Sequence, residues 1–254
     1  EQFFGLLYRN AGGEINGVAI TGARNEPLDG VAHGVGLALD NDDAVARSLT
    51  VTGCLVDDCQ KTGVSVITAA GTALTLDISG TEIAGAGPTG AIVQNGLEVT
   101  GGDVVVNLDT NTVRDLAWLG GASTATGILL RQCTGTVAGN VLSGCQSGLH
   151  LNAAAVSVSD NEISVPRPTD FGHGVLVDNT DPGFTDLAAS AARPHPPRPF
   201  REEWDRRAAR ATLTVAPCSV PRRNRRLLSP LIGLPPLHLP RRPARRCRRC
   251  AACP

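Results

Sequence analysis

The stretch GLLYRNAGGEINGVAITG, which runs from Gly5 to Gly22, decides the fold because a closely similar stretch occurs again downstream. The second version, GILLRQCTGTVAGNVLSG, runs from Gly127 to Gly144 and aligns with the first without a gap. Most other positions keep their apolar or polar character. Such self-similarity indicates a repeat architecture in which each unit solves the same packing problem. Six aligned positions are identical: Gly5 and Gly127, Leu7 and Leu129, Arg9 and Arg131, Gly13 and Gly135, Gly17 and Gly139, Gly22 and Gly144.

Two short patterns recur along the chain, and the units of the first are 21 to 33 residues apart. In both patterns apolar residues alternate with other residues, and Val, Ile, Leu and Thr dominate, which is typical of β-strands. No stretch between Glu1 and Thr185 has the periodicity of an amphipathic helix. The first pattern is Gly-apolar-x-apolar, with units beginning at Gly5, Gly34, Gly63, Gly96 (or Gly90), Gly127, Gly148 and Gly174. The second reads LTVTGCLV (49–56), LDISGTEI (76–83), VNLDTNTV (106–113) and VSVSDNEI (156–163).

Several short strands per repeat, without helices, predict a chain that coils and stacks on itself. Each strand then pairs in parallel with its equivalent in the next coil, about 4.8 Å away. Alternate side chains point into a narrow apolar core, and each coil needs neighbours to bury its faces. Asn111, Asn140 and Asn161 recur at one position of the repeat. We expect them at one corner, where a side-chain amide bonds the backbone of the turn above.

These features resemble the right-handed parallel β-helix of the pectate-lyase-like superfamily. The resemblance covers Gly5 to about Pro182 and implies an all-β, single-stranded solenoid of about seven coils. The leucine-rich repeat is the alternative, because its L-x-L-x-x-N/C-x-L core also fits the second pattern. That repeat needs a leading L-x-x-L and usually a helix or tight turn on its convex side, whereas here Val, Ile and Thr outnumber Leu at the key positions. We therefore interpret residues 1–187 as a parallel β-helix repeat domain.

The charge of the chain divides sharply near residue 192. Residues 1–192 contain 7 Lys and Arg against 21 Asp and Glu, a net charge of −14, whereas residues 193–254 contain 16 Arg against 3 acids, a net charge of +13. The first part also holds 28 of the 29 glycines, and the second holds 12 of the 17 prolines. A composition break of this size predicts a boundary, so we interpret residues 188–254 as a separate Arg/Pro-rich tail.

Three interpretations of this tail compete. It is a disordered basic segment that binds an anionic partner, or Cys247, Cys250 and Cys253 bind a metal, or the segment is frame-shifted, since GC-rich DNA read in a shifted frame yields Arg, Pro and Ala. The lack of Lys and of interleaved aromatic residues argues against a specific nucleic-acid partner. The lack of a second Cys-x-x-Cys argues against the metal. We favour a disordered or frame-shifted tail.

Two short motifs resemble those of polygalacturonases. DDC occupies residues 57–59 and GHG occupies residues 172–174. They are 115 residues apart, which is about four coils or close to 20 Å along the axis, whereas two carboxylates that cleave one sugar bond lie within about 10 Å. His33 precedes Gly34 in what we assign as the same phase of the repeat as His173 and Gly174. We therefore interpret both histidines as repeat residues rather than catalytic ones.

A cluster of acidic residues follows the second Gly-led strand. Asp40, Asp42 and Asp43 lie in the stretch LDNDD, and carboxylate oxygens clustered on a turn suit Ca²⁺. The resemblance implies that such a Ca²⁺ binds an acidic sugar and acidifies its ring proton, a reaction that also needs a basic residue. No basic residue among residues 1–187 lies in a motif that identifies it as that base. We name the three aspartates as candidate metal ligands, with a solvated acidic loop as the alternative.

Trp118 and four cysteines complete the candidates. Trp118 lies in the longest stretch between repeats, where a loop reaching over a groove would make it a substrate-binding residue; packing in the core or loop is the alternative. The cysteines stand at isolated turn or strand-edge positions, so we expect buried free thiols, while a disulfide stays open. They are Cys54, Cys59, Cys133 and Cys145.

The resemblance does not select one function, because the superfamily contains lyases, hydrolases, epimerases and non-catalytic surface proteins. We expect a non-catalytic repeat domain of an extracellular or cell-surface protein that binds a polysaccharide or serves in adhesion. The alternative is a Ca²⁺-dependent polysaccharide lyase or related enzyme. No apolar run is long enough to span a membrane. The chain begins at Glu1 without Met, so we expect a fragment, and we expect exposed coil ends to self-associate.

Overall fold

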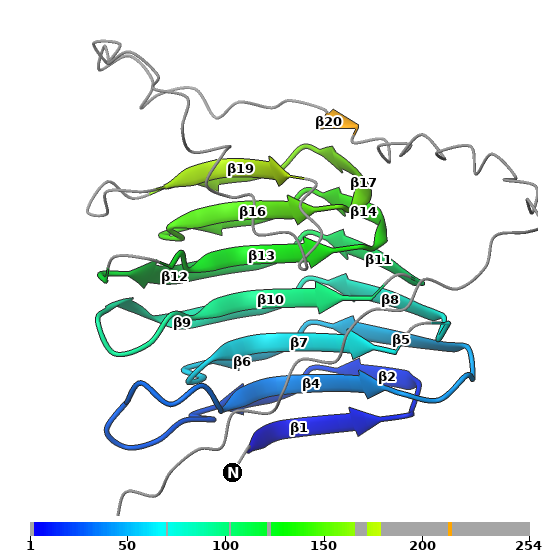
Figure 1. Ribbon diagram of the computed structural model, residues 1–254, viewed down its shortest axis with the longest axis horizontal. Coiled ribbons are helices and arrows are strands. Elements are labelled where there is room, and N and C mark those ends of the chain that lie inside the picture. Colours follow the sequence, from blue (N-terminus) through cyan, green and yellow to red (C-terminus); the bar gives the residue numbers. More distant parts are fainter. Residues whose placement is uncertain are drawn as a thin grey trace, which may run out of the picture. The chain divides into compact units, whose positions relative to one another are not determined.

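The computed structural model describes residues 3–69, 71–101, 103–120, 123–165, 172–178 and 213–214 (Figure 1). Within these residues the chain forms β-strands and no helix. The strands belong to three sheets that run along the whole stack, so the predicted all-β parallel solenoid is confirmed. The interpretations of residues 188–254 fall outside the described residues, apart from one two-residue strand.

Each complete coil contributes one strand to each of three sheets, here named A, B and C. Sheet A contains β1 (Phe4–Arg9), β4 (Val35–Asn41), β7 (Thr62–Thr68), β10 (Asn95–Thr100), β13 (Thr126–Arg131), β16 (Ser147–Asn152) and β19 (His173–Asp178). Sheet B contains β2 (Gly13–Asn16), β5 (Arg47–Thr52), β8 (Leu74–Ser79), β11 (Val104–Asp109), β14 (Thr134–Ala138), β17 (Ala155–Ser159) and β20 (Leu213–Thr214). Sheet C contains β3 (Ala19–Thr21), β6 (Leu55–Asp57), β9 (Glu82–Thr89), β12 (Thr112–Trp118), β15 (Val141–Ser143) and β18 (Glu162–Ser164).

Neighbouring strands pair in parallel throughout the three sheets, except that β20 pairs antiparallel with β17. Six coils carry all three strands and β19 begins a seventh, against the prediction of about seven. In Figure 1 the strands of sheet A cross the front towards the right, the chain returns behind them, and the coils climb from β1 to β19. This is the right-handed sense that parallel crossover connections adopt.

The core is built from alternate residues of each strand. In β8 the buried residues are Leu74, Leu76 and Ile78, and the residues between them are half-buried. Equivalent residues stack from coil to coil, so that Leu76 pairs with Leu49 on one side and with Val106 on the other. Each fully buried aliphatic side chain contributes about 1.5–3 kcal/mol to the stability of the stack. The period-two pattern in the sequence therefore marks the core directly.

A column of glycines along sheet A explains the recurring first residue of the repeat. A Cβ on any of six members would lie 2.5–2.8 Å from the carbonyl oxygen of the glycine in the next coil. That is closer than any real Cβ contact, so only glycine lets successive coils reach the strand spacing at this position. These six are Gly5, Gly36, Gly63, Gly96, Gly127 and Gly148, and Gly174 ends the column.

The second member of this column is Gly36, so the prediction of Gly34 at that position is wrong. Phe4 pairs with Val35, and this register sets Gly5 opposite Gly36. Gly34 instead precedes β4 with a φ of +82°, a left-handed conformation that glycine adopts readily. Both glycines fit Gly-apolar-x-apolar, and only the pairing between coils distinguishes them.

The phase assigned to His33 is wrong for the same reason. His173 pairs with Ser147 in sheet A, and the column that contains them ends at Val35 in the second coil and Phe4 in the first. His33 lies two residues before Val35, the member of that column in the second coil, and belongs to the connection that leads into β4. The GHG motif is therefore not repeated at His33.

The predicted asparagine corner is present and buried. Asn140 Oδ1 accepts a hydrogen bond from the backbone N–H of Asn111 at 2.9 Å, and Asn161 Oδ1 accepts one from the N–H of Asn140 at 2.9 Å. Thr81 and Cys54 continue the corner, since the N–H of Cys54 donates to Thr81 Oγ1 at 3.3 Å. Each side chain bonds the backbone of the preceding coil, so the predicted bond to the turn above is wrong in direction. The ladder satisfies backbone groups that water cannot reach.

The four cysteines of the solenoid are free and buried, as expected. Cys54 holds a corner position, and burial raises the pKa of Cys59, Cys133 and Cys145 to about 12. Because the thiolate is the reactive form, thiols with this pKa stay protonated at neutral pH and are inert. Their role in the described part of the chain is packing.

We expect these four thiols to resist alkylation at pH 8 in the folded protein and to react fully in denaturant. The measurement is iodoacetamide labelling with and without guanidinium, followed by mass spectrometry of the peptides that contain Cys54, Cys59, Cys133 and Cys145. Rapid native labelling of Cys133 or Cys145 would contradict the buried position that the structure gives them.

Candidate functional site

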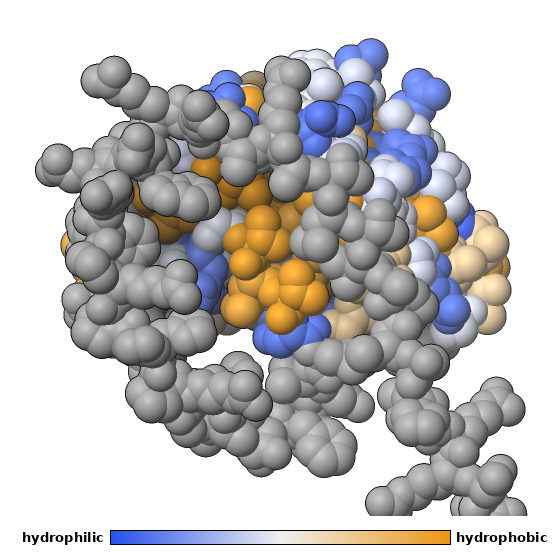
Figure 2. Space-filling model, turned by 90° about the horizontal axis from the view of Figure 1, so that it is seen from above, coloured by the Kyte–Doolittle hydropathy of each residue, from blue (hydrophilic) through white to orange (hydrophobic). Residues whose placement is uncertain are grey.

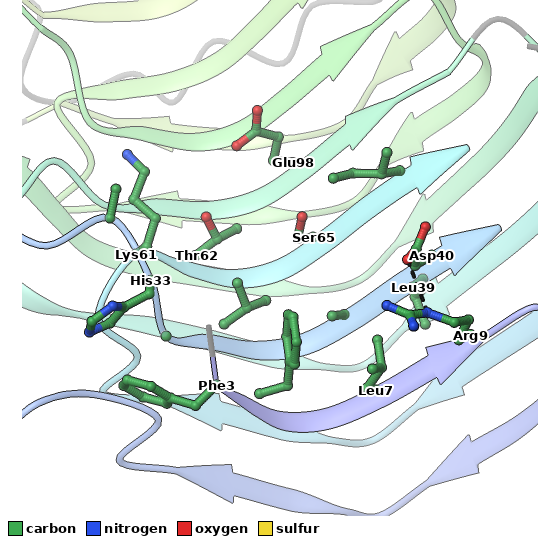
Figure 3. A pocket seen from close by; sticks show the side chains of 16 residues that line it. Phe3, Leu7, Arg9, His33, Leu39, Asp40, Lys61, Thr62, Ser65 and Glu98 are labelled. Atoms are coloured by element: carbon green, nitrogen blue, oxygen red, sulfur yellow. Dashed lines mark ion pairs between the residues drawn. The ribbon is translucent and has the colours of Figure 1, made fainter. Parts of the chain in front are cut away.

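A groove of about 290 Å³ lies on the outer face of sheet A. It crosses β1, β4, β7 and β10, the first four strands of that sheet (Figure 3). Side chains that do not enter the core stand outward in columns at the strand spacing, so residues from four coils meet there. Figure 3 labels Phe3, Leu7, Arg9, His33, Leu39, Asp40, Lys61, Thr62, Ser65 and Glu98 among the lining residues.

Apolar side chains form the floor of the groove. Leu7 is 38% exposed and Ile67 is 57% exposed, although both are large hydrophobic residues. Phe3 places its ring against that of His33, with the centroids 4.9 Å apart and the planes tilted by 56°. A concave apolar surface with a few polar groups at its edge is the usual composition of a small-molecule or glycan site.

A charged cluster from three successive coils borders the groove at β7 and β10. Arg131 Nη1 lies 3.1 Å from Glu98 Oε1, and Asn95 Nδ2 donates to Glu98 Oε2 at 3.0 Å. Lys61 Nζ donates to the carbonyl oxygen of Val93 at 2.8 Å. Desolvation lowers the pKa of Lys61, with Arg131 acting in the same direction and Glu98 opposing it. The cluster offers both hydrogen-bond donors and acceptors to a molecule in the groove.

The first two coils supply a second charged pair to the groove. Arg9 Nε lies 3.3 Å from Asp40 Oδ2, and the Arg9 side chain remains 61% exposed (Figure 3). Most of its guanidinium donors therefore face solvent and can reach a bound molecule. Of the three aspartates predicted as metal ligands, Asp40 alone lines the groove.

Each of the three aspartates has a different ion-pair or hydrogen-bond partner. Asp42 accepts from Asn10 Nδ2 at 2.6 Å, and Asp43 forms a two-point ion pair with Arg47. The hydrogen bond from Arg47 is the main cause that lowers the pKa of Asp43. Within the described residues, no group of three or more His, Cys, Asp or Glu side chains is arranged to hold a metal ion. The Ca²⁺ site at these residues stays a prediction.

Trp118 lies away from the groove, at the end of β12 in sheet C. It pairs with Thr89 of β9, and its indole lies over Gly120, where a Cβ would come within 2.3–2.7 Å of the ring. The ring is half-buried and packs on its own connection. Its predicted contact with a substrate stays a prediction.

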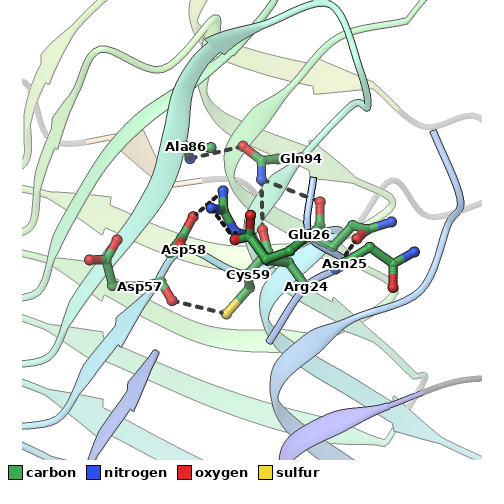
Figure 4. A network of polar contacts seen from close by, with 9 residues as sticks. Arg24, Asn25, Glu26, Asp57, Asp58, Cys59, Ala86 and Gln94 are labelled. Atoms are coloured by element: carbon green, nitrogen blue, oxygen red, sulfur yellow. Dashed lines mark hydrogen bonds and ion pairs between the residues drawn. The ribbon is translucent and has the colours of Figure 1, made fainter. Parts of the chain in front are cut away.

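The two polygalacturonase-like motifs do not meet. DDC begins at the last residue of β6 and is separated by two residues from β7, whereas GHG runs into the start of β19, four strand spacings or about 19 Å further along sheet A. In the first motif Asp58 forms an ion pair with Arg24 Nη1 at 2.9 Å, and Arg24 also binds Glu26 (Figure 4). Cys59 is buried. These contacts give DDC a structural role at the corner between sheets C and A.

Three buried glutamines at that corner were not identified by the sequence analysis. Gln94 Nε2 donates to the carbonyl oxygen of Cys59 at 2.6 Å, and its Oε1 accepts from the N–H of Ala86 at 3.0 Å (Figure 4). Gln60 and Gln146 bind backbone N–H groups of other connections in the same way. The sequence signal that could have identified them is a Gln that recurs one or two residues before a strand of sheet A, in three of the coils. These side chains hold the connections at the edge of sheet A in place.

Comparisons with protein-family models, with curated proteins and with solved structures find no match for this chain. The described residues contain no helix with the length and apolar character needed to cross a membrane.

Proposed function

We propose that this chain is a non-catalytic β-solenoid repeat domain that binds a polysaccharide in the groove on sheet A. The observation that carries the proposal is an apolar floor bordered by charged side chains, with Arg9 and Asp40 from the first two coils and Lys61 and Glu98 from the next two. Sugar rings present apolar faces and hydroxyl groups together, and a surface of this composition can contact both. The secreted or cell-surface location is part of the proposal and rests on the resemblance.

Charge favours a neutral polymer as the ligand. Residues 1–192 carry a net charge of −14, which repels acidic polysaccharides unless a cation bridges them. The groove itself contains acids and bases in pairs rather than an excess of one sign. Paired charges can form hydrogen bonds to hydroxyl groups without needing a counter-charge on the ligand.

We expect neutral polysaccharides to retard the full chain in affinity electrophoresis and Glu98→Ala to weaken this retardation about tenfold. The physical reason is that the substitution removes a groove acceptor and releases Arg131 from its position. Glu82→Ala is the matched control, because Glu82 forms the same kind of ion pair with Arg114 on sheet C, outside the groove. Absence of retardation by every polymer in a broad panel would refute the proposal, as would equal loss in both variants.

A Ca²⁺-dependent polysaccharide lyase is the second candidate, and one observation favours it. Lys61 is a basic residue with a lowered pKa beside Glu98 in the same groove, which suits an amine that accepts a proton. A lyase would release unsaturated sugars that absorb in the near ultraviolet when Ca²⁺ is present. It would lose this activity in Lys61→Ala, and its Ca²⁺ uptake would fall in Asp42→Ala and Asp43→Ala.

A further inference from the structure

Sheet A has two open edges that are complementary in direction. β1 begins the sheet and β19 ends it, and no strand of the described part pairs with the outer edge of either. Figure 2 views the β19 end and shows hydrophobic side chains gathered there. Val175 and Val177 of β19 are 41% and 46% exposed, whereas their partners Leu149 and Leu151 in β16 are buried. The end therefore presents a core layer and a parallel edge.

The glycine column indicates what fits this edge. Each earlier member lies against the carbonyl oxygen of the next glycine, but among the described residues a Cβ on Gly174 would meet only Ile163 Cγ2, at 3.9 Å. The carbonyl of another glycine in the same phase would complete the column. Since Gly36 directs its carbonyl at Gly5, the equivalent carbonyl of Gly5 points away from β4, at the opposite end of the stack. Gly174 at one end and the carbonyl of Gly5 at the other end are therefore the two groups that meet wherever two coils stack at this column.

The side chains at the two ends are also complementary. Continuing the ladder from β19 to β1 of a second copy sets apolar residues against apolar ones and a cation against an anion. Arg9 already pairs with Asp40 of the next coil at 3.3 Å, so a second carboxylate in the same column would place it between two acids. The pairs that this register gives are Leu6 with Val175, Tyr8 with Val177 and Arg9 with Asp178.

We propose that copies of this chain stack head to tail, with β1 of one copy pairing in parallel with β19 of another. The contact joins two different surfaces, so it does not close on itself and produces a ladder of oligomers instead of a single dimer. The inference goes beyond polysaccharide binding and does not depend on it, because copies can associate without a polysaccharide, although Arg9 belongs both to the groove and to this interface.

Gly174→Ala distinguishes this stacking from non-specific aggregation. Among the described residues of one copy the added methyl group has room, and the backbone of Gly174 is outside the left-handed region. In the stack the methyl group would meet the Gly5 carbonyl at the 2.5–2.8 Å found along the rest of the column. We expect the mass of the full chain in sedimentation velocity to rise with concentration. Gly174→Ala should weaken association at least about tenfold, with an unchanged circular dichroism spectrum and melting temperature.

A charge exchange tests the register independently. Arg9→Asp alone sets two acids against each other across the interface, and Asp178→Arg alone sets two arginines against each other, so each variant should remain monomeric. Mixing the two variants restores opposite charges at every contact between copies and should restore association. Asp109→Arg is the matched control, because Asp109 is exposed in the middle of sheet B, and it should associate like the parent protein.

Two results would overturn the proposal. One is a full chain that stays monomeric at every concentration. The other is association that is equally strong in the parent, in Gly174→Ala and in the single charge variants, since irregular aggregation would not depend on the register. Failure of the mixed variants to associate, when the parent does, would refute the pairing of Arg9 with Asp178.

Discussion

Gly96→Val is expected to prevent the central coils from forming. A Cβ at this position would lie 2.5 Å from the carbonyl oxygen of Gly127, 2.7 Å from Val113 Cγ1 and 2.8 Å from Leu116 Cδ1. One neighbour is backbone and the other two are buried core side chains, so no flexible group can move aside. The strand spacing between β10 and β13 cannot be kept, and we expect the free energy of unfolding to fall by more than about 4 kcal/mol.

Urea denaturation followed by circular dichroism measures this loss. Gly90→Ala is the control, because a Cβ there meets no atom of the described residues within 4 Å and the backbone of Gly90 is outside the left-handed region. We expect the control to change stability by less than about 0.5 kcal/mol. A variant that is found only in the insoluble fraction, beside a soluble control, agrees with the prediction. Equal urea midpoints for Gly96→Val and Gly90→Ala would show that the glycine column does not limit the coil spacing.

The fold could be predicted from the sequence because each coil repeats the same local requirements. The alternation of apolar residues identifies the core, as in β8, and Asn111, Asn140 and Asn161 identify the corner. The phase of the second coil could not be predicted, because Gly34 and Gly36 both fit the pattern. Only the contact of Gly36 with the next coil decides between them, and that contact depends on three-dimensional register.

The groove could not be predicted from local patterns, since its groups come from different coils. Lys61, Glu98 and Arg131 are more than thirty residues apart in the sequence and meet because parallel pairing sets coil beside coil. The opposite holds for Asp42 and Asp43, which are adjacent in the sequence but bind different partners. In a solenoid, residues that are close in the sequence therefore need not share a site. The residues that contact one another are those in the same column of successive coils.

Asn140→Ala should produce the second large loss of stability. Asn140 is fully buried, and its amide accepts from the N–H of Asn111 at 2.9 Å and donates to the carbonyl oxygen of Leu108 at 3.0 Å. Truncation removes the acceptor of the buried Asn111 N–H and the side-chain donor to the Leu108 carbonyl oxygen, and a buried group left unsatisfied costs about 1–3 kcal/mol. We expect the free energy of unfolding to fall by about 3 kcal/mol in urea denaturation. Asn16→Ala, at an exposed position of β2, is the control and should lie within about 0.5 kcal/mol of the parent protein.

Asn140→Asp shows whether the amide acts through its donors. The substitution keeps an oxygen that can accept from Asn111 and replaces the donor that faces three acceptors, namely the carbonyl oxygens of Leu108 and Ala138 and the Oδ1 of Asn161. Burial among acceptors raises the pKa of the new carboxyl above its unfolded value of about 4, because the neutral form alone can donate. The folded state then binds more protons than the unfolded state, so stability falls as the pH rises through that unfolded value. The deficit in urea midpoint relative to the parent protein should therefore be larger at pH 7 than at pH 4. An equal deficit at both values would mean that the corner depends on the shape of the side chain and not on its hydrogen-bond donors.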